Sequence, residues 1–536
     1  MGRFSGTPKR ELNMPRRARN PNQAAQQILP LLLLGIGLVA SNNYLTFIDD
    51  ETWILDSATQ PVRTTLGLFL SGAGQHEHPP LYDIVLHFWL RWTGGNFEYL
   101  RVPAIFFFLA GLFLLGRAAG RMSGPASAKA VIWIGILWPF AFHYGRLAAW
   151  YSFSFFLVAG LTLAYLRYLQ DQSRSRWAVF LLFGVALLWT NYFGWALLAC
   201  LAIDLFLRHR AGEREVPPGV LAGTAALFIV SYIPLFRAFY NELGNGIHTH
   251  QRFVSVIANA AFNVYSLFIS ESMAPWHWAL SIPAGLAVLG CVGLVLVYGS
   301  AAARRFLVYS GILIAVMGVT GILVTKRLLL VAPWVLLPVG IAVATISMRW
   351  VKMALAITLL VIAGIGWYGI RVRTFYSAPR FLEPWLQVAG DAADKLHGGA
   401  TVISNNPSFF FYLTYIVHAP DESATWKFQG VLPDTVHYAN VFSPDEWIAA
   451  GHPYAPTVLW IRGMDGPQTG GAMDDAMQQL DHACGARTSR LMMRDQGYVW
   501  KQKFFPELGE LPWRIEVREY DCAPATSPEI FPIPPH

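Results

Sequence analysis

The chain has 536 residues, more than one ordinary domain needs, and 54% of them are hydrophobic while only 14% are charged. That composition excludes an ordinary soluble protein. The net charge of +7 could indicate a nucleic-acid-binding protein, but the basic residues cluster at the ends of apolar runs. The positive-inside bias of membrane proteins explains this placement without any nucleic acid.

Apolar runs that could cross a bilayer core of about 30 Å recur through the first two thirds of the chain. They predict eleven membrane spans, near residues 28–46, 101–118, 129–143, 151–168, 177–191, 193–208, 219–236, 278–299, 306–324, 328–347 and 353–371. The first run is too long for a removable signal peptide. Basic residues precede the first span and recur in five later connections, so we expect a cytoplasmic basic tail at 1–25 and an external C-terminus.

Residues 80–93 are apolar enough to suggest a further span, but they are shorter than the roughly 20 residues that a spanning helix needs. Counting them as a span would also place the five basic connections outside. We therefore predict a helix lying at the membrane surface. It belongs to a large external loop, 47–100, in which two further short helices are expected. A second external loop is expected at 237–277.

From residue 372 onward the composition changes to that of a soluble domain. Segments with strand character alternate there with segments of helical spacing, which predicts a small external α/β domain over 372–536. The expected strands are 400–404, 457–461 and 514–517, and the expected helices are 382–396, 443–450 and 472–482. Cys484 and Cys522 lie in this domain, and a disulfide between them is plausible on an oxidising side of a membrane.

Three consecutive carboxylates, Asp49, Asp50 and Glu51, follow the first span where the chain leaves the membrane. Unpaired carboxylates are costly to desolvate there, so the cluster is a candidate site; the alternative is a solvated helix end. Asp50 and Glu51 could act as a general base, bind a divalent cation or accept hydrogen bonds from a sugar. Asp49 competes with Asp50 for the role of base.

A second polar pair, Glu77 and His78, precedes two prolines that fix the entry to the surface helix. The pair either positions a substrate or is an ordinary helix start with acidic character. Tyr82 follows in the first turn of that helix. Because two acidic clusters share one loop, a divalent cation bridging Asp50 and Glu77 is a further hypothesis.

Lys326 and Arg327 are predicted on the external side, against the positive-inside trend. A phosphate group in the outer leaflet would explain them; the alternative is that both cations reach lipid headgroups. Arg146 is a similar external cation. Arg101 opens the second span and could turn toward the first loop.

His248 and His250 stand in the second external loop, where they could bind a sugar or simply be solvated. Nothing in the chain resembles a P-loop, a Rossmann glycine fingerprint or a serine nucleophile elbow. The energy for any reaction must therefore come from the substrate.

Several of these segments together resemble the GT-C glycosyltransferases, closest to the branch of the protein O-mannosyltransferases and the lipid A aminoarabinose transferases (glycosyltransferase family 39-like). The segments are Asp50-Glu51-Thr52, Glu77-His78-Pro79-Pro80-Leu81, Arg101-Val102-Pro103 and Lys326-Arg327-Leu328-Leu329 with Pro333. The aminoarabinose transferases have lysine where this chain has His78. The similarity covers the layout of residues 1–371, and its diagnostic motifs concentrate in 47–103.

The resemblance implies a multi-span α-helical membrane protein with a GT-C fold over 26–371 and an α/β domain in the periplasm, in a bacterial inner membrane. It implies an inverting transfer of a sugar from a polyprenyl-phosphate donor to a hydroxyl of a glycolipid such as lipopolysaccharide, a polysaccharide or a protein. Asp50 would be the base, with Asp49, Glu51 and Glu77 as further catalytic candidates. The donor phosphate would bind to Lys326, Arg327 and Arg146. The substrate would contact His78, Tyr82, Arg101, His248 and His250.

Two other classes of function stay open. A transporter or flippase for a lipid-linked sugar would need ionisable residues at mid-bilayer depth, and Asp204 is the one convincing candidate, although it lies near a cytoplasmic end. A polysaccharide polymerase or ligase would use a large late external loop, such as 237–277.

Overall fold

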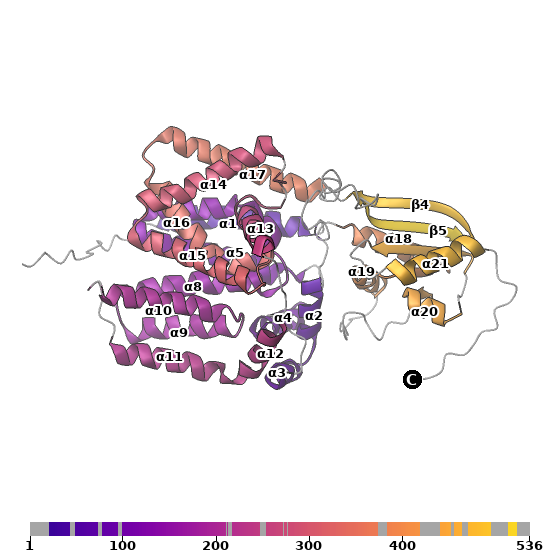
Figure 1. The fold of residues 1–536 in the computed structure, drawn as a ribbon, viewed down its shortest axis with the longest axis horizontal. Coiled ribbons are helices and arrows are strands. Elements are labelled where there is room, and N and C mark those ends of the chain that lie inside the picture. The colour runs from indigo at the N-terminus through magenta and orange to yellow at the C-terminus, as the bar shows by residue number, and fades with distance from the viewer. Residues whose placement is uncertain are drawn as a thin grey trace, which may run out of the picture.

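A computed structural model describes residues 21–42, 45, 49–72, 78–94, 99–210, 212, 217–246, 253–271, 273–275, 277–372, 383–418, 440–451, 455–463, 470–494 and 513–522. The chain forms a helical module followed by a module built on one β-sheet (Figure 1). The helices of the first module are α1 (Pro21–Ala40), α2 (Asp49–Thr59), α3 (Val62–Ser71), α4 (Leu81–Trp92), α5 (Val102–Ser123), α6 (Pro125–Ile136), α7 (Pro139–Tyr144), α8 (Trp150–Gln170), α9 (Arg174–Leu188), α10 (Gly194–Arg210), α11 (Pro218–Tyr232), the 3-10 helix η3 (Ile233–Leu235), α12 (Phe236–Gly246), α13 (Phe253–Ile269), α14 (Trp278–Tyr298), α15 (Ala301–Val319), the 3-10 helix η4 (Thr325–Leu330), α16 (Ala332–Thr345) and α17 (Arg349–Val372).

Each of the eleven predicted spans falls largely on helix. Six helical segments of the described chain are long and apolar enough to cross a membrane: α5, α8, α14, α15, α17 and the segment Gly219–Asn241, which runs from α11 into α12. The other five predicted spans correspond to α1, α6, α9, α10 and α16, which are shorter or less apolar. The structure therefore agrees with a multi-span membrane protein, while the count of eleven stays a prediction.

The first predicted external loop contains the three short helices expected from its sequence, α2, α3 and α4. Pro61 precedes α3, and Gly72 ends it in the left-handed conformation, with φ of 67°. The amphipathic helix α4 buries Tyr82, Leu86 and Leu90, which recur every four residues on one face. Figure 1 shows α2, α3 and α4 at the end of the helical module that faces the sheet module.

The second predicted loop, 237–277, differs from expectation because much of it is helical. The 17-residue apolar helix α13 packs against α7, α15 and η4. Its asparagines and serines interrupt the hydrophobic run, so hydropathy alone did not indicate a helix there. This segment is consequently part of the packed module.

Helix α8 forms the centre of the helical module and is buried along nearly its whole length. It packs against α5, α9 and η4. At 1.5 Å per residue, Tyr151 at its start and Arg167 near its end lie about 24 Å apart. The two ends of α8 thus reach opposite ends of the module.

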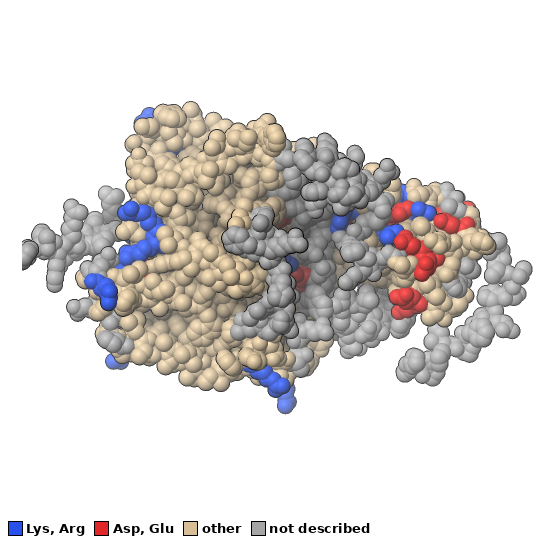
Figure 2. Space-filling view, viewed as in Figure 1, with Lys and Arg blue, Asp and Glu red and all other residues tan. Residues whose placement is uncertain are grey.

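Basic side chains gather at the end of the helical module that lies farthest from the sheet module (Figure 2). Ion pairs bring several of them together there: Arg208 on α10 and Arg305 on α15 both bind Asp204. Acidic side chains are prominent instead on the visible face of the sheet module (Figure 2). This separation of charge fits the predicted orientation, which itself remains an expectation.

The second module contains a five-stranded sheet in the order β2-β1-β3-β5-β4. Strands β2, β1 and β3 are parallel, and β5 pairs antiparallel with both β3 and β4. Its elements are α18 (Trp385–His397), β1 (Thr401–Ser404), α19 (Pro407–His418), β2 (Val441–Phe442), α20 (Pro444–Ala449), β3 (Thr457–Gly463), α21 (Gly470–Ala483), β4 (Gly485–Arg494) and β5 (Trp513–Asp521). All three predicted strands and all three predicted helices are present, while α19, β2 and β4 were not predicted.

Successive residues of the central strands point to opposite faces of this sheet, as strand geometry requires. Leu459 and Ile461 lie in a hydrophobic core shared with α18 and α19, which is continuous with the core of the helical module. Val458 and Trp460 pack in a separate core with α20 and α21. The module is therefore a three-layer α/β/α sandwich that docks on the helices through its α18 and α19 side.

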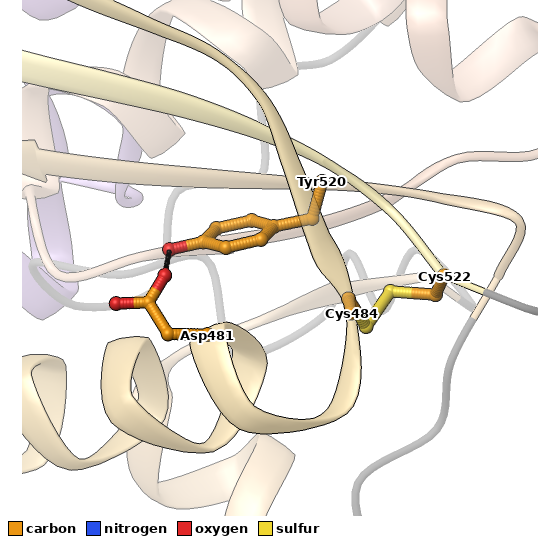
Figure 3. The surroundings of a disulfide bond; sticks show 4 residues. All are labelled: Asp481, Cys484, Tyr520 and Cys522. Atoms are coloured by element: carbon orange, nitrogen blue, oxygen red, sulfur yellow. Dashed lines mark hydrogen bonds between the residues drawn. A yellow bond between two sulfur atoms is a disulfide. The ribbon is translucent and has the colours of Figure 1, made fainter.

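The predicted disulfide between Cys484 and Cys522 is present (Figure 3). It joins the residue after α21 to the residue after β5. One helical turn away, the hydroxyl of Tyr520 donates to the carboxylate of Asp481 at 2.8 Å (Figure 3). Both links fasten α21 to the sheet.

Candidate active site

Asp50 lies in the first turn of α2, and its carboxylate contacts two residues from distant segments. One oxygen binds the ammonium group of Lys326 on η4 in an ion pair. The same oxygen accepts a hydrogen bond of 2.5 Å from the hydroxyl of Tyr151 at the start of α8. The Asp50 side chain is 26% exposed, so the carboxylate stays accessible to a substrate. The structure thus brings the predicted base and a predicted phosphate ligand together.

The helix η4 places Lys326 beside α8, because η4 packs directly on that helix. The Lys326 ammonium lies 5.9 Å from the centroid of the Tyr151 ring, within the range of a cation–π contact. Pro333 lies in the first turn of α16, shortly after η4, where its missing N–H removes no hydrogen bond within the helix. Arg327 follows Lys326 on η4 and is half-buried. Its guanidinium lies 3.5 Å from the carbonyl of Ile322.

Glu51 and Arg101 form a buried bidentate ion pair next to Asp50. The Nε and Nη2 atoms of Arg101 lie 2.8 and 2.7 Å from the two carboxylate oxygens of Glu51. Glu51 also accepts from the backbone N–H of Ala148 at 2.8 Å, and Arg101 donates to the carbonyls of Asn42 and Leu45. Both side chains are almost wholly buried. This arrangement fits a role in holding α2 against the start of α5 better than contact with a substrate.

Arg146 is fully buried, and its hydrogen bonds to described residues go to the C-terminal end of α1 and to the residue that follows this helix. Its Nη1 atom donates to the carbonyl of Leu38 at 3.0 Å and to the hydroxyl of Ser41 at 2.6 Å. The guanidinium also lies 5.9 Å from the ring centroid of Trp367 on α17. The structure therefore groups Arg146 with α1 and α17, while Lys326 and Arg327 lie together on η4.

His78 lies just before α4 and packs on the residue that precedes Tyr151. Its ring centroid is 3.9 Å from that of Trp150 and 6.4 Å from that of Tyr192. Burial, together with the positive charges of Arg327 and Lys326, lowers the pKa of His78 well below 6.5. The imidazole is consequently neutral at pH 7 and belongs to the same electrostatic environment as the two cations of η4.

Tyr82 is fully buried on α4, and its ring centroid lies 5.8 Å from that of Phe153. Its hydroxyl has no hydrogen-bond partner among the residues that the structure describes. Burial, with added repulsion from Glu51 and Asp83, raises the pKa of this phenol far above its usual range. Tyr82 therefore stays protonated and faces the buried Glu51 side of the site.

Four predicted site residues cannot be placed. Glu77, His248 and His250 lie outside the described residues, and so does the side chain of Asp49. Among the residues that the structure describes, no three His, Cys, Asp or Glu side chains lie close enough together to hold a metal ion. The cation hypothesis for Asp50 and Glu77 thus stays a prediction.

Sequence reasoning missed the contribution of the segment 148–151. Tyr151 binds Asp50, Trp150 packs on His78, and the backbone N–H of Ala148 binds Glu51. These residues read as the start of an apolar span, and neither a charge nor a spacing distinguishes them. The one signal available was that Tyr151 is the first residue of the predicted span 151–168, at its external end.

Asp204, the candidate for a transport relay, lies in a buried network at the other end of the module. Its carboxylate binds Arg208 and Arg305, and it accepts hydrogen bonds from the hydroxyls of Tyr165 at 2.5 Å and Tyr309 at 3.3 Å. These partners come from α10, α15 and α8. The network ties three helices together.

No protein-family model and no curated protein matches the sequence. Several solved structures are similar to the chain, and two of them match nearly its whole length. The crystal structure of ArnT from Cupriavidus metallidurans bound to undecaprenyl phosphate has a TM-score of 0.52 and 13% identity, covering 95% of this chain and 100% of that one. The apo structure of the same protein has a TM-score of 0.50 and 14% identity, covering 92% and 98%. At these identities the similarity shows the fold alone, and that fold is the fold of ArnT.

Proposed function

We propose that the protein transfers a sugar from a polyprenyl-phosphate carrier to a hydroxyl group of a cell-envelope acceptor, with inversion at the anomeric carbon. The observation that carries the proposal is the contact of Asp50 with Lys326 and Tyr151. It joins a proton acceptor to a phosphate-binding cation at one accessible point. The ArnT fold supports the same proposal, because one of the two ArnT structures binds undecaprenyl phosphate.

In the proposed reaction the carboxylate of Asp50 takes the proton from the acceptor hydroxyl. The acceptor oxygen attacks the anomeric carbon, and the bond between that carbon and the phosphate oxygen breaks. The phosphate keeps the electron pair and leaves as polyprenyl phosphate. Lys326 and Arg327 stabilise its added negative charge, an effect that is strong where water is scarce. Atoms and charge balance with no nucleotide or redox partner.

The Asp50–Lys326 ion pair has a function of its own in this scheme. Without the donor, each charge neutralises the other. The donor phosphate competes with Asp50 for Lys326, and the carboxylate becomes a stronger base once its cation is shared. Base activation is thereby coupled to donor binding.

We further propose that the site and the sheet module face the periplasm. The disulfide between Cys484 and Cys522 supports this orientation, since such bonds persist on the oxidising side of a membrane. The gathering of basic side chains at the opposite end of the helical module supports it as well.

The decisive experiment measures transfer and donor binding separately in purified protein. The wild type should bind undecaprenyl phosphate and transfer sugar from an undecaprenyl-phosphate donor to an acceptor fraction extracted from the cell envelope. Asp50→Asn should retain binding of undecaprenyl phosphate and lose transfer. Normal transfer by this variant would remove Asp50 as the base, and failure of the wild type to bind undecaprenyl phosphate would remove the proposal.

A further inference from the structure

Tyr151 is a buried residue at the start of α8 whose hydroxyl meets the carboxylate of Asp50. Tyr151 is 2% exposed, and its hydroxyl donates to the Oδ2 atom of Asp50 at 2.5 Å. The ammonium group of Lys326 binds the same oxygen atom in its ion pair. Two donors from different segments of the chain therefore converge on one oxygen of the proposed base.

The packing around Tyr151 fixes the place of its hydroxyl. Tyr151 is the second residue of α8, which is buried along nearly its whole length. The ring centroid of Trp150 lies 4.2 Å from that of Tyr151. Three residues before Tyr151, the backbone N–H of Ala148 binds Glu51, the neighbour of Asp50 on α2. The start of α8 thus contacts two successive carboxylates of α2, and it reaches Asp50 from inside the protein.

The two described partners of Asp50 differ in how they respond to the donor. The ammonium group of Lys326 is a cation, and the donor phosphate competes for it in the proposed reaction. The hydroxyl of Tyr151 carries no charge and belongs to a buried side chain. When Lys326 turns to the phosphate, the hydrogen bond from Tyr151 remains to orient the carboxylate.

We propose that Tyr151 is the positioning residue that holds Asp50 in place for proton transfer while the donor phosphate occupies Lys326. The inference rests on the proposed function and adds a residue to its machinery. A hydroxyl that donates to a carboxylate fixes its direction and stabilises its ionised form. A general base needs both, because it has to be ionised and within hydrogen-bond reach of the proton. Tyr151 itself exchanges no proton with the substrate.

Several other charged or titratable groups lie around the same end of the helical module. They are Glu51 and its partner Arg101, Lys326 and Arg327 on η4, His78 beside those two cations, and Asp83 and His87 on α4, which packs against α2. Each of them is present both in the wild type and in a variant that lacks only the Tyr151 hydroxyl. A difference between those two proteins therefore reports on the hydroxyl and not on the neighbouring charges.

The test measures kcat and the KM for the donor in the purified protein, with the same donor and acceptor fraction as for Asp50→Asn. Tyr151→Phe keeps the ring that packs on Trp150 and lies 5.9 Å from the Lys326 ammonium, and it removes only the hydroxyl. We expect kcat to fall by about 10-fold or more, because a misplaced reacting group is costly. The KM and the affinity for undecaprenyl phosphate should stay the same, because the Asp50–Lys326 pair is left in place.

The pH–rate profile gives a second readout that a purely structural role would not move. Loss of the hydrogen bond makes the Asp50 carboxylate easier to protonate, so the acidic limb of the profile should move to higher pH in Tyr151→Phe. Tyr168→Phe is the matched control, since Tyr168 lies on the same helix near its other end. It should leave kcat, KM and the profile unchanged.

A double variant shows whether Tyr151 acts through Asp50. Adding Tyr151→Phe to Asp50→Asn should cause no further loss of transfer, because the hydroxyl then has no base to position. A further loss as large as in the wild type would overturn the inference, and so would an unchanged kcat and pH profile in Tyr151→Phe. Loss of undecaprenyl phosphate binding by Tyr151→Phe would show a structural role and overturn it as well. Normal transfer by Asp50→Asn, or no binding of undecaprenyl phosphate by the wild type, would instead contradict the proposed function.

Discussion

Asp50 and Lys326 form an ion pair although 276 positions separate them in the chain. Neither residue can position the other through local structure, since α2 and η4 are joined through the packing of the whole helical module. The pair lies at the start of α8, where Tyr151 holds the carboxylate from a third segment. Three elements that are distant in the sequence, α2, η4 and α8, therefore meet at one carboxylate.

Replacing Asp50 with asparagine tests the proposed base with almost no change of shape. We expect the transfer rate to fall by about 100-fold to 10,000-fold, the usual contribution of a general base. The affinity for undecaprenyl phosphate should be retained or rise, because the carboxylate no longer competes with the phosphate for Lys326. Initial rates with a radiolabelled donor measure the first quantity, and equilibrium binding measures the second. Asp171→Asn is the control, because that side chain is 55% exposed and lies at the other end of α8.

Replacing Lys326 with glutamine removes the cation but keeps a hydrogen-bond donor of similar length. A hydrogen bond to a charged group contributes about 1.5–3 kcal/mol, so the affinity for undecaprenyl phosphate should fall by about 10-fold to 150-fold. Lys326→Arg should retain much of the affinity for undecaprenyl phosphate, because it keeps the positive charge. Lys352→Gln, which alters an exposed lysine that contacts the carbonyl of Ala344 on α16, should have no effect. Unchanged affinity in Lys326→Gln would exclude Lys326 as a phosphate ligand.

The pH dependence of stability should reveal His78. Its folded-state pKa lies below 6.5 because of burial and the neighbouring Arg327 and Lys326. Below pH 6.5 the unfolded chain therefore binds more protons than the folded one, and stability falls as the pH decreases. The slope reaches about 1.4 kcal/mol per pH unit at most.

Thermal unfolding of the wild type and of His78→Gln between pH 7.5 and pH 5.5 measures this contribution. The wild type should lose more stability than the variant on acidification. Parallel curves would show that His78 is not held neutral in the folded protein. His209→Gln is a suitable comparison, since His209 lies in the last turn of α10, away from Lys326 and Arg327.

The sequence allowed several local elements of the site to be predicted, because their signals are local. Prolines and a glycine mark α3 and α4, and short runs of β-branched and other apolar residues mark β1 and β3. The predicted external position of Lys326 and Arg327 led to the hypothesis of a phosphate site, which stays a prediction. These features depend on hydropathy and backbone preference, which neighbouring residues determine.

The partners of those residues could not be predicted, because they depend on how helices pack. Tyr151 reads as an ordinary aromatic residue of a span, and its contact with Asp50 follows from the position of α8. Helix α13 was missed because Asn259, Asn263 and Ser266 interrupt its hydropathy. Glu51 looked like a catalytic candidate beside Asp50, yet helical geometry turns the two side chains in different directions, and Glu51 meets Arg101 instead.

Removing one partner of the Glu51–Arg101 pair should destabilise the protein strongly. Both groups are buried, so Glu51→Gln or Arg101→Met leaves a charge without its counter-ion, at a cost of about 3–5 kcal/mol. The double change Glu51→Leu with Arg101→Met should recover part of this loss. Thermal unfolding compares the variants with Asp171→Asn, which breaks an exposed pair with Arg176 and should change stability by at most about 1 kcal/mol. If breaking the Glu51–Arg101 pair lowered stability no more than breaking the Asp171–Arg176 pair, the structural role of Glu51 would be contradicted.

The disulfide between Cys484 and Cys522 should stabilise the sheet module without taking part in the reaction. It closes a loop with a sequence separation of 38 residues, and chain entropy predicts a contribution of about 4 kcal/mol, with 2–4 kcal/mol typical of measured cases. Cys484→Ser with Cys522→Ser should therefore increase hydrogen exchange in α21 and β5, while binding of undecaprenyl phosphate persists. Cys200→Ser is the control, because Cys200 is a free, buried thiol of α10. Unchanged exchange in the double variant would show that the hydrogen bond of Tyr520 to Asp481 and the packing of α21 hold that helix without the covalent link.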